Sequence, residues 1–120
     1  MLKTTLLILT MIPGEAPRVT LSAYDSAEEC EAARDVVSQI LTEAGQEPQA
    51  ALCGETGLRV TPYVHGAPRR AEVNHYRIEL PAEGGFTVAA LQEGEVCEDA
   101  HEADPAVWCA VSAQHPISVE

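Results

Sequence analysis

Residues 18–53 read RVTLSAYDSAEECEAARDVVSQILTEAGQEPQAALC, and this stretch decides the fold. Residues 18–24 alternate apolar and polar side chains, which is the pattern of a half-buried strand. Ser26, followed three residues later by Glu29, forms a capping box and marks the start of a helix. Residues 50–53 read as the next strand. The stretch therefore predicts a helix that lies on a sheet.

The predicted helix is amphipathic and ends at Gly45, a natural C-terminal stop. Its apolar positions follow helical spacing: Cys30, Ala33, Val37, Ile40, Leu41 and Ala44. Its other side carries Glu31, Arg34, Asp35, Ser38 and Glu43. This distribution favours a surface helix with one face on a sheet over a coiled-coil strand.

The rest of the chain reads mainly as β-structure. Further strands are predicted at residues 58–64, 76–80, 86–91 and 106–112. The first of these is a separate short strand or a continuation of residues 50–53 beyond a break. The second and third form a hairpin around a turn at residues 81–85. Residues 92–104 form an acidic connection with room for one helical turn, and no internal sequence repeat is evident.

The composition leaves only a thin hydrophobic core. The hydrophobic fraction is 46% but includes many alanines, while Leu, Ile, Val and Phe together number 27 of 120 residues. That share is just above the level of about 20% at which highly charged chains tend to stay disordered. Such a domain needs covalent staples. We expect one α+β domain over residues 17–120, with one amphipathic helix packed on a mainly antiparallel, disulfide-stapled sheet.

Residues 1–16 have two interpretations. They fit a short signal peptide, with Lys3 as the positive region, residues 6–12 as the apolar region and Ala16 at a small-residue cleavage site. The alternative is a buried N-terminal strand, because residues 4–12 are a continuous β-favouring apolar run that ends at a Pro-Gly turn. The run is too short to cross a bilayer, which takes about 20 apolar residues.

The four cysteines fall into two separated pairs. We predict that Cys30 pairs with Cys53 and Cys97 with Cys109, because these partners are near each other in sequence and the core is thin. Four cysteines allow three pairings, so the other two stay open at this stage. Free buried thiols are the alternative if the protein stays in a reducing compartment.

A metal site is a second alternative for part of this set. Cys97, His101, Cys109 and His115 offer two thiolates and two imidazoles within nineteen residues, the donors that tetrahedral zinc prefers. Their spacing fits no zinc-finger pattern well, so we predict disulfides here and no cofactor.

The charge of the chain restricts its partners. It carries 19 acidic and 7 basic residues, a formal net charge of −12, which argues against nucleic acid and anionic membrane surfaces. Six of the twelve residues from 93 to 104 are carboxylates. We interpret this run as a solvated face, with a divalent cation or a basic partner protein as the alternatives.

No catalytic motif occurs. The sequence lacks GxSxG, HExxH, P-loop and GxGxxG patterns, so we predict that the protein is not an enzyme. His75 is interpreted as the solvent-facing member of an alternating strand. Trp108 is interpreted as core filling, with a ligand-binding aromatic surface formed together with Tyr63 as the alternative.

One family resemblance concerns residues 18–53. Their strand, helix and strand, with Tyr24-Asp25-Ser26 before the helix and Glu43-Ala44-Gly45 at its end, resemble the first half of a SPOR-type peptidoglycan-binding repeat. The resemblance covers about a third of the chain. A SPOR repeat has a second helix where this chain has the predicted hairpin at residues 76–91, so we do not assign the family.

Together these features predict a non-enzymatic, periplasmic or secreted binding or accessory module of a bacterium. One lysine against six arginines, with many alanines, is typical of a GC-rich bacterial or phage genome. The expected partner is another protein or a cell-wall component. The alternative is a structural subunit of a phage-type particle or envelope complex, with residues 6–12 retained as a strand or docking segment.

Overall fold

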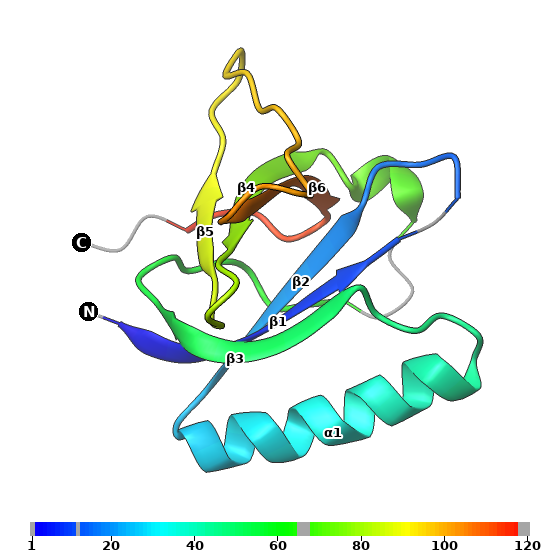
Figure 1. Cartoon of the computed structure of the whole chain (residues 1–120), viewed down its shortest axis with the longest axis vertical. Coiled ribbons are helices and arrows are strands. Elements are labelled where there is room, and N and C mark those ends of the chain that lie inside the picture. The colour runs from blue at the N-terminus through cyan, green and yellow to red at the C-terminus, as the bar shows by residue number, and fades with distance from the viewer. Residues whose placement is uncertain (1, 12, 65–67, 118–120) are drawn as a thin grey trace.

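The structure is a computed structural model that describes residues 2–11, 13–64 and 68–117. Within these residues one helix lies on a sheet of six strands in the order β3-β1-β2-β6-β4-β5 (Figure 1). The elements are β1 (Lys3–Thr10), β2 (Arg18–Tyr24), α1 (Ala27–Glu43), β3 (Ala50–Thr56), β4 (Asn74–Leu80), β5 (Thr87–Ala90) and β6 (Ala106–Ser112), with a 3-10 turn at Arg69–Ala71. Only the β2–β6 pair is parallel, so the predicted α+β class with a mainly antiparallel sheet is confirmed.

Strand β1 is central to its part of the sheet. It pairs antiparallel with β2 on one side and with β3 on the other. Leu7 and Leu9 point into the inner core, while Leu6 and Ile8 point toward α1, and all four are buried. Cleavage after Ala16 would remove this strand. The signal-peptide interpretation of residues 1–16 stays a prediction.

Helix α1 begins and ends where the sequence indicates. The Ser26 hydroxyl accepts a hydrogen bond from the Glu29 amide at 3.1 Å, and Gly45 follows the helix with φ +77°. Cys30 is fully buried, with Val37 and Leu41 packed beside it. Ile40, predicted on the packed face, is 59% exposed. It lies about 60° around the axis from Val37, at the edge of the covered stripe.

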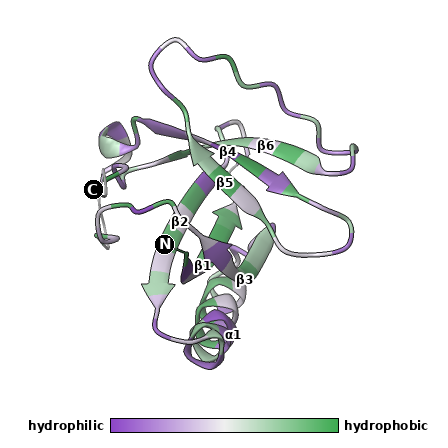
Figure 2. Cartoon of the chain, turned by 90° about the vertical axis from the view of Figure 1, so that its left-hand side faces the viewer, coloured by the Kyte–Doolittle hydropathy of each residue, from purple (hydrophilic) through white to green (hydrophobic). Residues whose placement is uncertain are grey.

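The main core lies between the two ends of the curved sheet. Tyr76, Ile78 and Trp108 from the second part of the chain meet Leu7 and Leu9 of β1 there. Phe86, just before β5, reaches β3, and its ring lies 2.8 Å from where a side chain on Gly54 would begin. Phe86 thus brings the start of β5, one edge strand, close to β3, the other edge strand. Figure 2 shows hydrophobic residues, in green, on neighbouring strands of the sheet.

The sheet consists of two halves with the same connectivity. In the first half (residues 3–56), β1 pairs with its hairpin partner β2 and, after α1 has crossed, with β3. In the second half (residues 74–112), β4 pairs with its hairpin partner β5 and, after residues 92–104 have crossed, with β6. The chain therefore contains a topological repeat, although we found no repeat in its sequence.

The two halves meet along a short seam. The parallel ladder between β2 and β6 has one register pair, Arg18 with Val111. Arg18 also forms an ion pair with Glu72 at 2.7 Å. The seam continues at Gln114, whose side-chain amide bonds both backbone groups of Leu21. A few polar contacts therefore complete the sheet between the halves.

Two local expectations are corrected. Residues 58–64 form no strand apart from an isolated bridge between Val60 and Pro116, because Pro62 cannot donate to a ladder. Instead β3 continues through Gly54 to Thr56. The acidic connection contains turns but no helical turn, because Ala100 pairs with Val107 of β6 instead.

Candidate functional site

We call residues 92–104 the acidic strap. It leaves the sheet after β5, projects beyond it and returns to β6 (Figures 1 and 2). Its far end is tied to β6 by reciprocal backbone hydrogen bonds of 2.9 Å between Ala100 and Val107. The Asp99 carboxylate accepts a further bond of 2.9 Å from the Cys109 amide. The strap is thus anchored at a defined place on the sheet.

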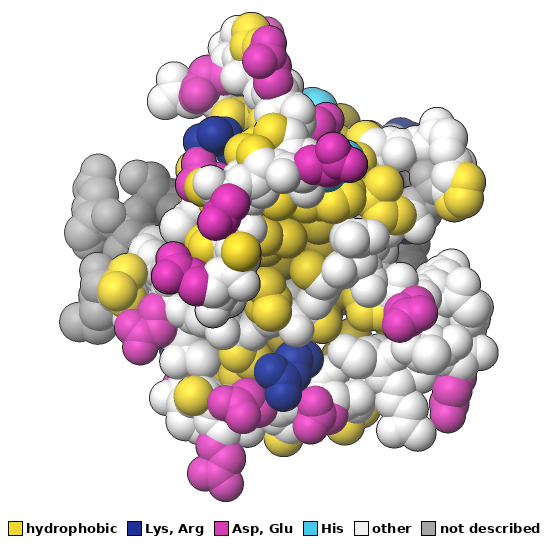
Figure 3. Space-filling view, in the orientation of Figure 1, with side chains coloured by type: hydrophobic (Ala, Val, Ile, Leu, Met, Phe, Trp, Pro, Cys, Tyr) yellow, Lys and Arg dark blue, Asp and Glu magenta, His cyan; other side chains and the backbone are white. Residues whose placement is uncertain are grey.

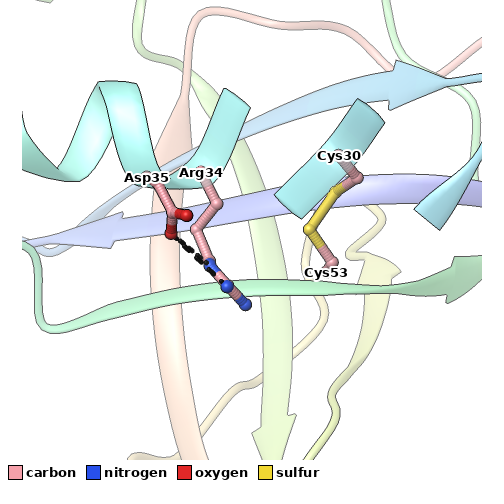
Figure 4. A network of polar contacts seen from close by, with 4 residues as sticks. All are labelled: Cys30, Arg34, Asp35 and Cys53. Atoms are coloured by element: carbon pink, nitrogen blue, oxygen red, sulfur yellow. Dashed lines mark hydrogen bonds and ion pairs between the residues drawn. A yellow bond between two sulfur atoms is a disulfide. The ribbon is translucent and has the colours of Figure 1, made fainter. Parts of the chain in front are cut away.

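Two disulfides join the crossover connections to the sheet. Cys97 of the strap is bonded to Cys109 of β6, and Cys30 of α1 is bonded to Cys53 of β3. Each bridge ends on the fourth residue of its strand. Figure 4 shows the Cys30–Cys53 disulfide between α1 and β3, with Arg34 and Asp35 in contact beside it. The predicted disulfide pairing is confirmed.

The four alternative metal ligands do not form a metal site within the described residues. Cys97 and Cys109 are bonded to each other, so neither sulfur is a free thiolate. His101 stacks on Trp108 with ring centroids 3.5 Å apart, and His115 contacts the Asn74 side chain at 3.1 Å. Within the described residues no three His, Cys, Asp or Glu side chains are placed to hold a metal ion.

Two adjoining cavities lie beneath and beside the strap. The larger has a volume of about 650 Å³ and is lined by Val73, Asn74, His75, Leu91, Gln92, Glu93, Gly94, Glu95, Cys97, Cys109, Ala110 and Pro116. The smaller, of about 540 Å³, is lined by Arg77, Leu91, Glu95, Val96, Glu98, Asp99, Ala100 and Val107. They share Leu91 and Glu95, and we call the two together the strap groove.

The strap groove is predominantly acidic. Glu93 and Glu95 line the larger cavity, and His75 is the one basic side chain among its lining residues. Arg77 lines the smaller cavity, where its charge is balanced by an ion pair with Glu79. Figure 3 shows acidic side chains gathered on the projecting loop and around an apolar area below it. The strap groove thus has a floor of mixed polarity, which includes Asn74, His75 and Cys109, and a negative rim with Glu93 and Glu95.

A buried polar cluster beside this region was missed by our sequence analysis. The Tyr76 hydroxyl donates to the Gln114 carbonyl at 2.6 Å, and burial raises the pKa of Tyr76 to about 12. Gln114 is 3% exposed, and its amide also donates to the Thr61 carbonyl at 2.9 Å. A glutamine near the end of a chain carries no sequence pattern that marks it as buried. These groups hold the fold together.

The remaining candidate residues lie as follows. His75 is exposed on β4, as interpreted from the alternation. Trp108 is 8% exposed and belongs to the inner core, whereas Tyr63 is 52% exposed. The core-filling interpretation of Trp108 therefore agrees with the structure.

Comparisons with known proteins give no further guide to function. No protein-family model, curated protein or solved structure matches this chain. Over the described residues, no helix has both the length and the apolar character needed to span a bilayer.

Proposed function

We propose that this protein is a non-enzymatic binding or accessory module of a bacterium, and that it works in the periplasm or outside the cell. The observation that carries the proposal is the matched pair of disulfides, which fix both crossover connections to the sheet. Disulfides of this structural kind form and persist in oxidising compartments. In this proposal the strap and the sheet face beneath it form the binding surface.

Two polar side chains of this region, Asp99 and Tyr76, are occupied in structural contacts, which supports binding over catalysis. Asp99 bonds the Cys109 amide and the His101 ring. The Tyr76 hydroxyl, whose pKa burial raises to about 12, donates to the buried Gln114 carbonyl. Groups held in this way fix the geometry of a surface.

A second candidate is a structural subunit of a larger assembly, such as a phage-type particle or an envelope complex. The observation that favours it is the place of β1, which is paired along both edges. Its loss would leave β2 and β3 without their shared antiparallel partner and would expose the inner core. Under this candidate residues 3–10 stay in the mature protein.

One experiment on the native protein tests both candidates. Source cells carrying a C-terminally tagged copy are fractionated, and the intact mass is measured without reductant. We expect the protein in the periplasm or medium, lighter than the reduced chain by the four hydrogens lost to two disulfides. Four alkylatable thiols in a cytoplasmic protein would contradict the first candidate. A mass that lacks residues 1–16 would contradict the second.

A further inference from the structure

We propose that the strap groove binds a positively charged, Arg- or Lys-bearing segment of a partner protein. This inference rests on the proposed binding function and names the partner class. It comes from comparing the outer faces of the two halves, meaning the sheet faces that their crossover connections cover.

The outer face of the first half is closed by α1. Leu6 pairs with Cys53 and Ile8 with Ala51, and the helix covers this face so that Leu6 is 3% and Ile8 6% exposed. A packed helix therefore leaves no room for a ligand on this side.

The matching face of the second half lacks such a cover. Arg77 pairs with Cys109, as Leu6 pairs with Cys53, so Arg77 occupies the position equivalent to Leu6. Arg77 and His75 are exposed. The strap crosses this face of the sheet, but it leaves the two cavities beneath and beside it open. The disulfide and the Asp99 bond hold the strap over the sheet at one end, so the groove has a fixed wall.

The size of this space suits a ligand. The larger cavity, at about 650 Å³, falls within the range of about 300 to 1,000 Å³ found for binding pockets. Val73 and Leu91 give it apolar lining. The aliphatic stem of a long basic side chain can pack on such a surface while its charged end reaches polar groups.

Charge complementarity decides which ligand fits. Glu93 and Glu95 line the larger cavity, and the whole chain carries a net charge of −12. Such a field raises the association rate of cationic partners and opposes anionic ones. A guanidinium or ammonium group would form charge-assisted hydrogen bonds with the two carboxylates. A basic segment therefore matches the charge of the groove.

The test is titration calorimetry of the full oxidised chain with a short peptide of alternating Arg and Ser. The double variant Glu93→Gln/Glu95→Gln removes the proposed contacts. Glu28→Gln/Glu31→Gln, on exposed positions of α1, removes the same charge elsewhere. We expect the first variant to raise Kd by about tenfold or more and the second by less than about twofold, since exposed distant charges are screened. Amide NMR shifts should centre on Val73, His75 and Leu91.

Three results would overturn the inference. Equal weakening by both variants would mean that only the overall charge attracts the peptide. Equal binding of a peptide with Gln in place of Arg would exclude recognition of a cation. The proposed function is tested separately by localisation and disulfide state, so an exported, oxidised protein that ignores basic peptides would contradict this inference alone.

Discussion

Gln114 bonds Leu21 as a neighbouring strand would. Its Oε1 accepts from the Leu21 amide at 2.8 Å, and its Nε2 donates to the Leu21 carbonyl at 2.8 Å. One side chain thus satisfies both backbone groups of a strand residue where the β2–β6 ladder has ended. The seam between the two halves depends on this amide.

We expect Gln114→Ala to lower the free energy of unfolding by about 2 to 4 kcal/mol, because it leaves buried backbone groups without partners. Denaturant unfolding measures the change. Gln39→Ala removes an exposed amide that bonds only the Glu43 side chain at 3.3 Å, and it should cost less than about 0.5 kcal/mol. Equal costs for the two variants would mean that Gln114 does not hold the seam.

Reduction of the disulfides should destabilise the protein strongly. The bridges close loops with sequence separations of 23 and 12 residues. The chain-entropy model gives each a contribution of about 3 kcal/mol, which corresponds to a fall in Tm of about 10 °C or more. A chelator should leave Tm unchanged. Thermal melts with reductant or chelator test this, and a Tm that falls with chelator alone would favour the metal alternative.

Stability should fall at high pH because of Tyr76. Burial raises its folded-state pKa from 10.0 to about 12. Its contribution is fully present below pH 10 and is lost as the pH rises through 12, since ionisation is harder in the folded state. The loss should approach about 3 kcal/mol. Tyr76→Phe serves as the control, since it should cost about 1 kcal/mol at pH 7 and abolish this part of the pH dependence.

Gly54→Ala should destabilise the contact between the two edge strands. The new Cβ would lie 2.8 Å from the Phe86 ring, which is itself buried. Overpacking of this kind costs about 1 to 3 kcal/mol. Phe86→Leu should relieve the clash, so a double-mutant cycle should show a coupling well above zero. Additive effects of the two substitutions would mean that the residues do not touch.

Local periodicity was enough to predict much of the fold. Alternation located β2 and the β4–β5 hairpin, and the capping box located the first turn of α1. Both disulfide pairs followed from the sequence proximity of the cysteines and the thin core. These features depend on neighbouring residues, so a single sequence contains them.

The features that the sequence did not reveal depend on contacts between distant segments. Gly54 was interpreted as part of a strand break, but it lies within β3, where its lack of a side chain leaves room for the Phe86 ring. The topological repeat was missed because equivalent positions carry dissimilar residues, such as Leu6 and Arg77. The strap groove was missed because it forms only where residues 92–104 cross the second half of the sheet, a contact between segments that the sequence alone does not place together.

Each disulfide closes a covalent ring inside its own half of the protein, and only the main chain of residues 57–73 links one half to the other. A single cut in that tether would yield two fragments that share no covalent bond. Their reassociation would depend on the core, the Arg18–Glu72 ion pair and the Gln114 amide. The protein is therefore suited to division into a complementing pair, in which the affinity between fragments reports the strength of the seam.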